Sequence, residues 1–326
     1  MQLQTVPNEQ EKIPLLVIAG PTASGKTKLS IDLAKRFDGE IVSADSMQIY
    51  KKMTIGTAKP TPEEMDGIPH HLIDFVEPGE SFSVAEYVEL ARKVIAEIHA
   101  RGKLPIVVGG TGFYIQAQLY DIDFTEQECD SAYRRQLEEL AETRGNHYLH
   151  EMLKAVDPAS AEAIHENNRK RVIRALEFYH ESGERISEHN ERESQKTSPY
   201  NFAYFVLNDD REKLYRRIDA RVDAMVKAGL VDEVARLQQM GCHADMVSMQ
   251  GLGYKEILAY LNGTSTLEEA IYIIKHESRH FAKRQLTWFR RERDVIWLNK
   301  PDFEYDDTKI LTYMMDVLQA KGILPA

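Results

Sequence analysis

The fold of this chain is decided by residues 15–27, which read LLVIAGPTASGKT. The first five residues are apolar and β-prone, as in a strand buried on both faces of a parallel sheet. The rest has two glycines with four residues between them, followed by Lys and Thr. This is the pattern of a loop whose backbone N–H groups surround phosphate oxygens, and a helix predicted over residues 25–37 points its positive end at them. The stretch therefore predicts an α/β protein that binds a diphosphate or a triphosphate.

The alternation of strands and helices continues beyond this loop. Strands are predicted over residues 40–43 and 104–108. Between them, Ser83 and Glu86 form a capping-box pattern ahead of a periodic apolar stretch, which indicates a helix that ends at Gly102. This order predicts a doubly wound parallel sheet, the α/β core of phosphate-binding-loop (P-loop) NTPase-like proteins.

After residue 120 the pattern changes from alternating strands and helices to helices alone. Residues 125–182 are predicted to be helical, and the polar residues 184–199 are predicted to form a loop. The core then resumes with a strand, a helical region and a last strand, predicted over residues 202–207, 211–293 and 295–298. We therefore predict a core of residues 1–121 and 200–326 and a helical insertion domain of residues 122–199.

The composition is that of an ordinary globular protein. Hydrophobic residues make up 43% of the chain and no apolar run is long enough to span a bilayer, so no membrane partner is expected. The two cysteines, Cys129 and Cys242, lack metal-ligand spacing. We therefore expect a reducing cytoplasmic location and no zinc. The net charge of −11 argues against a basic coat for nucleic acid but allows a local basic groove.

The set of residues that usually catalyses phosphoryl transfer is incomplete in this sequence. P-loop ATPases and kinases usually carry an apolar strand that ends in an Asp, which holds magnesium. Here the strand at residues 104–108 ends in Gly109-Gly110-Thr111-Gly112, and the nearest strand-terminal carboxylate is Asp45. That carboxylate can hold a metal ion or accept a proton, so the NTPase interpretation is weakened.

Six motifs follow one another along the chain: residues 20–27, DSMQIY at 45–50, PHHLID at 69–74, GGTG at 109–112, RVIRALE at 171–177 and KRQLTWFR at 283–290. Together, over about residues 14–299, they resemble the bacterial tRNA dimethylallyltransferase family, also called tRNA isopentenyltransferases. The resemblance implies transfer of a dimethylallyl group from dimethylallyl diphosphate to N6 of the adenosine next to the anticodon of tRNA, with release of diphosphate. It also implies Mg²⁺ as cofactor, tRNA and dimethylallyl diphosphate as partners, and a monomer.

The same resemblance assigns roles to the loop residues. They would bind the diphosphate, and Thr27 would also bind the metal: Gly20, Pro21, Thr22, Ala23, Ser24, Gly25, Lys26 and Thr27. Asp45 would hydrogen-bond the adenine N6 as general base, and Thr111 would contact the reacting centre or the diphosphate. From the residues alone, a helix cap or an outer-sphere magnesium contact also fits Asp45, and a simple turn also fits Thr111.

An arginine is the third catalytic residue that the resemblance implies. Arg221 matches the family's diphosphate-binding arginine, and a guanidinium suits a diphosphate because it can form two hydrogen bonds at once. Arg217 and Arg221 lie four residues apart, so they could equally form a solvated helix face. Only the motif favours Arg221 over Arg217.

The tRNA contacts implied by the resemblance fall into three groups. They are Asp45, Ser46, Met47, Gln48 and Thr111 near a flipped-out adenine; Arg134, Lys170, Arg171, Val172, Ile173 and Arg174 in the insertion; and Arg284, Trp288 and Arg290 near the C-terminal end. Basic residues among aromatic ones suit phosphate contacts and base stacking. Taken alone, the stretch near the C-terminal end is equally consistent with an amphipathic helix whose aromatic residues lie in the core.

Three other functions are compatible with the loop. The first is a P-loop kinase for a small molecule, which would leave the insertion and the basic aromatic stretch unexplained. The second is an adenylate isopentenyltransferase that uses AMP or ATP as acceptor and needs no extended RNA surface. The third is a nucleotide-gated RNA-binding switch, against which the incomplete NTPase machinery counts.

Overall fold

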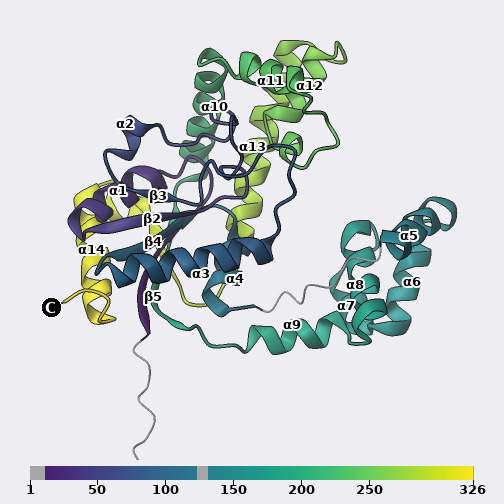
Figure 1. Ribbon diagram of the computed structural model, residues 1–326, viewed down its shortest axis with the longest axis horizontal. Coiled ribbons are helices and arrows are strands. Elements are labelled where there is room, and N and C mark those ends of the chain that lie inside the picture. The colour runs from purple at the N-terminus through teal and green to yellow at the C-terminus, as the bar shows by residue number, and fades with distance from the viewer. Residues whose placement is uncertain (1–11, 123–130, 326) are drawn as a thin grey trace, which may run out of the picture. The chain divides into compact units, whose positions relative to one another are not determined.

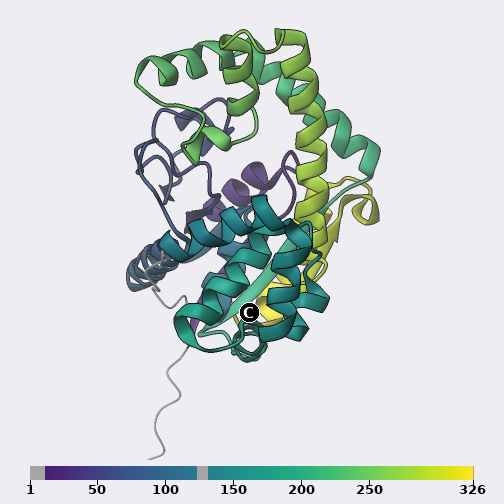
Figure 2. The same cartoon turned by 90° about the vertical axis from the view of Figure 1, so that its right-hand side faces the viewer.

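The computed structural model of the chain describes residues 12–122 and 131–325. By its internal contacts the chain divides into two compact units. We call Met1–Leu119 with Ser198–Ala326 the core unit, and Tyr120–Thr197 the insertion unit. The two units are shown in Figures 1 and 2 and are described separately below.

The core unit is built on a parallel sheet, which has six strands among the described residues (Figure 1). The strands are β1 (Ile13–Ala19), β2 (Gly39–Ala44), β3 (His70–His71), β4 (Leu104–Gly109), β5 (Tyr200–Asn208) and β6 (Val295–Asn299). Their order is β3-β2-β4-β1-β5-β6, and the predicted strands are confirmed. Leu16 of β1 lies opposite Ile106 of β4 on one side and Ala203 of β5 on the other. The loop after β1 therefore leaves the sheet near its middle, where ligands bind in folds of this kind.

Helices cover both faces of this sheet. On one face, the side chains of Leu16 and Phe205 pack with Leu33 of α1 (Lys26–Arg36) and Met314 of α14 (Asp307–Ala320). On the other face, α3 (Val84–Ala100) packs over β1, β2 and β4. The capping box predicted for α3 is present. The sheet is thus doubly wound, as predicted, and its fold is of the P-loop NTPase type.

A second apolar cluster lies among the remaining helices of the core unit. The helices that contribute to it are α10 (Arg211–Lys227), α11 (Leu230–Gln239), α12 (Tyr254–Leu261) and α13 (Leu267–Phe289), with the short 3₁₀ turn Ser248–Gln250. The core unit also contains α2 (Pro62–Met65), α4 (Gly112–Tyr120) and a second 3₁₀ turn, Lys300–Phe303. Val222, Leu237, Ile257 and Ile274 from α10, α11, α12 and α13 meet in this cluster with Tyr50. Figures 1 and 2 show α13 running from α12 back toward the sheet.

The described part of the insertion unit is entirely helical, as predicted. Its helices are α5 (Ser131–Arg144), α6 (Asn146–Val156), α7 (Pro158–Ala163), α8 (Arg169–Ser182) and α9 (Ile186–Ser194). Leu137, Leu153 and Val172 are fully buried and form the centre of its own core. The predicted helical residues 125–130 lie outside the described residues. Within residues 12–122 and 131–325, no helix is both long and apolar enough to cross a membrane.

One element of the insertion unit differs from the prediction. Residues 184–199 were expected to form a loop, but Ile186–Ser194 is the helix α9. The prediction is wrong because tertiary contacts, rather than an apolar stripe, hold this polar segment. The backbone N–H of Ser187 donates to Asp157 Oδ2 (3.0 Å) and its hydroxyl donates to Asp157 Oδ1 (2.7 Å). Ion pairs of Arg185 with Glu188 and of Arg192 with Glu184 add to them.

Candidate active site

The predicted phosphate-binding loop connects β1 to α1 and has the backbone shape of such a loop. Gly20, Ala23 and Gly25 have positive φ angles of 146°, 60° and 94°. At Gly20 a side chain has no room, because a Cβ atom would lie 2.8 Å from the carbonyl oxygen of Leu207. Gly25 immediately precedes α1, so the loop ends on the exposed N–H groups of a helix N-terminus.

Lys26 is folded back onto this loop. Its Nζ donates hydrogen bonds to the carbonyl oxygens of Gly20 (3.0 Å) and Pro21 (2.8 Å). Burial lowers the pKa of Lys26 to about 8; the nearby positive charge of Arg221 lowers it further, and Asp45 partly opposes both effects. The site therefore concentrates positive charge that no neighbouring carboxylate fully neutralises, which is the condition for binding an anion.

Gln285 of α13 ties this loop to the turn after β4. Its Oε1 accepts a hydrogen bond from the backbone N–H of Thr22 (3.0 Å), and its Nε2 donates to the carbonyl oxygen of Gly110 (2.9 Å). A Cβ atom at Gly110 would lie 2.4 Å from that nitrogen, so a side chain at this position would displace the Gln285 amide. Gln285 belongs to the KRQLTWFR motif, but its role as a bridge cannot be read from the sequence.

Asp45 and Thr111 lie at the ends of neighbouring strands and are linked through the backbone. Asp45 Oδ1 accepts hydrogen bonds from the N–H groups of Met47 (2.9 Å) and Gln48 (3.3 Å). Thr111 Oγ1 accepts one from the N–H of Ser46 (3.0 Å). Thr111 thus has the turn-forming role that the sequence left open, whereas Asp45 holds a turn rather than the helix cap considered as an alternative. In the described structure, however, the second carboxylate oxygen of Asp45 accepts no hydrogen bond.

A cavity of about 440 Å³ opens in front of these residues. Its lining brings together four predicted site residues from different segments, namely Lys26, Asp45, Thr111 and Arg221, and also Thr27. Burial lowers the pKa of Arg221, against the opposing effects of Asp45 and Glu64. The cavity therefore brings the cationic side chains of Lys26 and Arg221 and the carboxylate of Asp45 together at the carboxyl edge of the sheet, and Lys255 and Arg284 add two further cationic side chains to its lining.

The structure distinguishes the two candidate arginines. Arg217 donates to the carbonyl oxygen of Ala23 (2.9 Å) and forms an ion pair with the buried carboxylate of Asp209 (2.6 Å). Arg217 is thus held behind the phosphate-binding loop. Arg221 lines the cavity, and its Nη2 lies 3.5 Å from the carbonyl oxygen of Ala58. Of the two, Arg221 is the one placed to contact a ligand.

The opposite wall of the cavity is a loop held by one buried carboxylate. Glu233 Oε2 accepts hydrogen bonds from the backbone N–H groups of Thr54 (3.0 Å) and Ile55 (2.8 Å). Its Oε1 accepts from Gly56 N–H (3.1 Å) and from the hydroxyl of Tyr254 (2.7 Å). No sequence pattern marks Glu233 for this role, because its partners lie far away along the chain.

The core residues predicted to contact tRNA occupy two kinds of position. Ser46, Met47, Gln48 and Arg284 line the cavity. Trp288 instead packs on Gly112, where a Cβ atom would lie 2.2 Å from the indole ring, and meets Phe113 edge to face at 6.0 Å. Arg290 is exposed just after α13 ends. In the KRQLTWFR stretch, Trp288 therefore serves packing, whereas Arg284 lines the cavity and Arg290 is exposed.

The insertion residues predicted to contact tRNA also differ in exposure. Lys170 and Arg171 are exposed and Arg174 is half-buried. Val172 and Ile173 are buried in the core of the insertion unit, so their side chains are not presented to a ligand. Arg134 forms a two-pronged ion pair with Glu177, with N–O distances of 2.8 and 2.6 Å. Because the Glu177 side chain is fully buried, removing Arg134 would leave an uncompensated charge inside the unit, so this arginine has a structural role.

Taken together, the doubly wound sheet and the loop between β1 and α1 define an α/β protein of the phosphate-binding-loop class. The model of the family described as IPP transferase matches residues 48–292. The chain belongs to the tRNA dimethylallyltransferase family and is an enzyme of the prenyltransferase type. The resemblance seen in the six motifs is thereby confirmed.

Relatives in sequence and in structure agree with this assignment. The tRNA dimethylallyltransferases of Lachnoclostridium phytofermentans and Acetivibrio thermocellus are 59% and 54% identical to this chain, over 95% of it and over 99% and 98% of their own lengths. The full-length tRNA isopentenylpyrophosphate transferase of Bacillus halodurans matches with a TM-score of 0.72 at 47% identity, over 95% of this chain and 98% of that one. A eukaryotic dimethylallyltransferase acting on tRNA matches with a TM-score of 0.79 at 32% identity, and the match covers 92% of this chain and 77% of that one.

Proposed function

We propose that this enzyme transfers a dimethylallyl group from dimethylallyl diphosphate to N6 of the adenosine 3′-adjacent to the anticodon of tRNA and releases diphosphate. One observation supports this most directly. A single cavity is lined by the cationic side chains of Lys26 and Arg221 and by the carboxylate of Asp45. A diphosphate leaving group needs cationic side chains that stabilise its charge, and an amine nucleophile needs a carboxylate that accepts its proton.

The reaction would proceed as a displacement at C1 of the dimethylallyl group. A bond forms between adenine N6 and C1 as the bond from C1 to the diphosphate oxygen breaks, and the diphosphate leaves with that electron pair. Lys26, Arg221 and the loop N–H groups would stabilise the charge on the diphosphate. Asp45 would accept the proton from N6 with the carboxylate oxygen that makes no backbone hydrogen bond. Thr111 would help to hold that carboxylate and the turn beside it in place.

The cofactor we propose is Mg²⁺. Magnesium prefers oxygen ligands and is usually bound by one or two protein groups together with phosphate oxygens and water. The hydroxyl of Thr27 lines the cavity that would hold the diphosphate and offers such a ligand, so it fits this ion. When bound, magnesium would neutralise part of the charge of the diphosphate.

We propose tRNA contacts for each unit separately. Ser46, Met47 and Gln48 line the cavity and would contact the flipped adenine. Lys170 and Arg171 in the insertion unit, with Arg284 and Arg290 in the core unit, would contact the RNA backbone, since their charged ends are exposed. The cytoplasmic location and the monomeric state remain predictions from the sequence.

The test is a transfer assay with purified protein, Mg²⁺ and radiolabelled dimethylallyl diphosphate. Unmodified bulk tRNA, AMP and ATP serve as parallel acceptors. We expect label in tRNA, placed next to the anticodon by nuclease mapping, and none in AMP or ATP. Label in AMP or ATP alone would contradict the proposal and assign the adenylate isopentenyltransferase activity, and transfer of phosphate from ATP to a metabolite would assign a kinase.

A further inference from the structure

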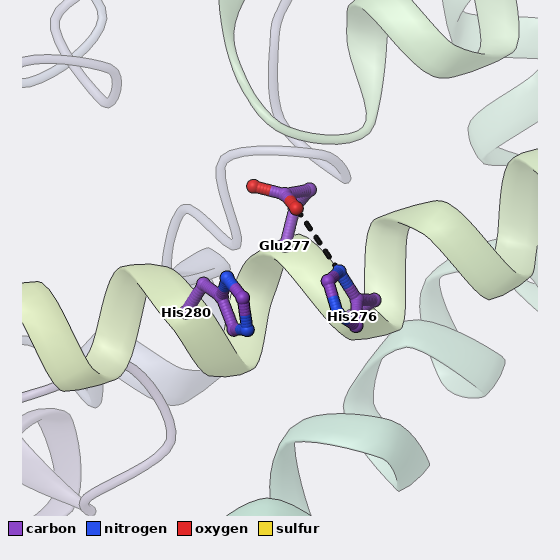
Figure 3. A group of neighbouring side chains, drawn as sticks. All are labelled: His276, Glu277 and His280. Atoms are coloured by element: carbon purple, nitrogen blue, oxygen red, sulfur yellow. Dashed lines mark hydrogen bonds and ion pairs between the residues drawn. The ribbon is translucent and has the colours of Figure 1, made fainter.

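The outward face of α13 carries two histidines and a glutamate that no step of the proposed reaction uses (Figure 3). His276 and His280 lie four residues apart, which places them on one face of the helix, and Glu277 stands beside them. The two imidazole rings are 4.3 Å apart between their centroids. His276 Nδ1 lies 3.0 Å from Glu277 Oε1, and one ligand atom from each residue lies within 4.8 Å of the other two.

This cluster is separate from the proposed active site. The same helix supplies Ser278, Phe281 and Gln285 to the cavity, whereas none of the three cluster residues is among its described lining. Their side chains are half-buried at His276 and Glu277 and exposed at His280, so an ion in solution can reach them.

The helix under the cluster is fixed in place. Arg279 forms an ion pair with Asp219 of α10, and Lys275 forms one with Asp223 of the same helix, both with N–O distances of 2.6 Å. Lys275 precedes the cluster and Arg279 lies within it, and both pairs join α13 to α10. Ligands on a rigid element need only side-chain rotation to bind an ion, which favours binding.

We propose that His276, Glu277 and His280 form a binding site for a borderline first-row transition metal ion such as Zn²⁺. Two imidazole nitrogens and one carboxylate oxygen suit zinc, whereas magnesium prefers oxygen ligands alone. Zinc–nitrogen bonds of 2.0–2.1 Å place neighbouring ligand atoms of a tetrahedron about 3.4 Å apart. The ligand atoms lie within 4.8 Å of one another, and side-chain rotation would bring them to this spacing as Glu277 exchanges its hydrogen bond with His276 for the metal.

The three ligands are not equivalent. His276 and His280 lie four residues apart on one face of the helix, whereas Glu277 projects from a position about 100° around the helix axis from His276. We therefore expect the two imidazoles to contribute most of the affinity and Glu277 the least. With three protein ligands, the fourth position of the ion is left to water.

The experiment is a Zn²⁺ titration of the metal-stripped full chain against a chromophoric chelator, in excess Mg²⁺ so that oxygen-ligand sites are filled. A parallel titration with Co²⁺ records the intense visible absorption of a tetrahedral site. We expect one equivalent of zinc to bind, and His276→Gln and His280→Gln each to weaken it about tenfold or more. His243→Gln is the matched control, because His243 is also exposed and also lies near a carboxylate, that of Asp245 at 3.7 Å.

Two results would overturn the site. The first is unchanged zinc affinity in the double variant His276→Gln/His280→Gln. The second is an equal loss of affinity in His243→Gln, which would mean that zinc binds exposed histidines without selection. The substituted side chains are solvent-accessible, so circular dichroism should report unchanged folding. The readout is metal binding, so it is independent of whether prenyl transfer occurs.

Discussion

Asp45 holds its turn and faces the cavity with different atoms. Its Oδ1 accepts the two backbone hydrogen bonds that shape the turn after β2, while the residue also lines the cavity. A substitution can therefore remove the charge and keep the turn. Lys26 is similar, since it contacts two loop carbonyl oxygens and also lies where an anion would bind.

Replacing Asp45 by Asn should separate chemistry from structure. An asparagine Oδ1 can still accept from Met47 and Gln48, but the amide is a far weaker base. We expect the single-turnover rate of transfer to tRNA to fall by about 10²–10⁴. Binding of dimethylallyl diphosphate should not weaken, because a negative charge beside the anion has been removed. Asp245→Asn, at a highly exposed carboxylate, serves as the control, and a full rate in Asp45→Asn would rule out Asp45 as the base.

The pKa of Lys26, lowered to about 8, predicts a pH dependence for binding of the diphosphate. A bound anion favours the charged form and so raises the pKa of Lys26. Below pH 8 the free protein already holds the proton and affinity is constant; above pH 8 affinity should fall by up to about tenfold per pH unit. Calorimetric titrations with dimethylallyl diphosphate from pH 7 to 9.5 measure this. In Lys26→Arg the guanidinium stays charged, so a fall of the same size there would assign the pH dependence to another group.

At the scale of elements, the cavity is assembled by contacts between segments that are distant in sequence. Gln285 on α13 joins the loop after β1 to the turn after β4. Glu233 on α11 holds the segment from Thr54 to Gly56, next to Ala58, whose carbonyl oxygen faces Arg221. The helices beyond the sheet therefore shape the site as well as cover the core.

Replacing Glu233 by Gln should loosen this wall of the cavity. One carboxylate oxygen becomes an NH₂ donor that faces backbone N–H donors, leaving buried polar groups unsatisfied. We expect the free energy of unfolding to fall by about 3 kcal/mol and the KM for dimethylallyl diphosphate to rise. Urea denaturation and steady-state kinetics measure the two effects. Tyr254→Phe removes one of the four hydrogen bonds and should cost about 1 kcal/mol; equal stability of Glu233→Gln and the parent would contradict this account.

At the scale of the whole molecule, the insertion unit is a self-contained addition to the core unit. The two apolar clusters centred on Leu16 and on Tyr254 contain residues of the core unit only, and the insertion has a cluster of its own. On the two sides of the insertion, Gln118 and Tyr200 are joined by a hydrogen bond. A short linker can therefore span the gap left by removing the insertion.

Replacing residues 122–197 by a short Gly/Ser linker should divide the two binding functions. We expect the shortened protein to keep its affinity for dimethylallyl diphosphate, since the cavity lining lies within the core unit. Affinity for tRNA should fall, together with the steepness of its dependence on salt, because phosphate contacts are lost. Calorimetry measures the affinity for dimethylallyl diphosphate, and gel-shift titrations measure the affinity for tRNA. Unchanged tRNA affinity would exclude the insertion from the RNA-binding surface.

The sequence predicts those parts of the molecule that depend on neighbouring residues. Apolar runs such as residues 15–19 predict the strands, and the glycine spacing predicts the loop together with its lysine. Helix α9 escapes prediction because it is stabilised by Asp157, thirty residues away. The roles of Glu233 and Gln285 cannot be predicted from the sequence for the same reason. The partners of Gln285 lie 263 and 175 residues away along the chain, and the loop held by Glu233 is also distant in sequence. The expectation of no zinc rested on the spacing of the cysteines. The His-Glu-x-x-His spacing of residues 276–280 is visible in the sequence, but only the structure shows that the three ligand atoms lie within 4.8 Å of one another.

The contact of Lys26 with its own loop has a consequence for inhibitors of this enzyme. The ammonium group donates hydrogen bonds to two carbonyl oxygens of its own loop, so part of its hydrogen-bonding capacity is already used. A competitor must draw the lysine away from both oxygens, and only a compound with strong negative charge replaces what the lysine loses. Uncharged isosteres of a diphosphate should therefore be poor inhibitors however well they fit, and screening libraries for this enzyme should be weighted toward bisphosphonates and other dianions.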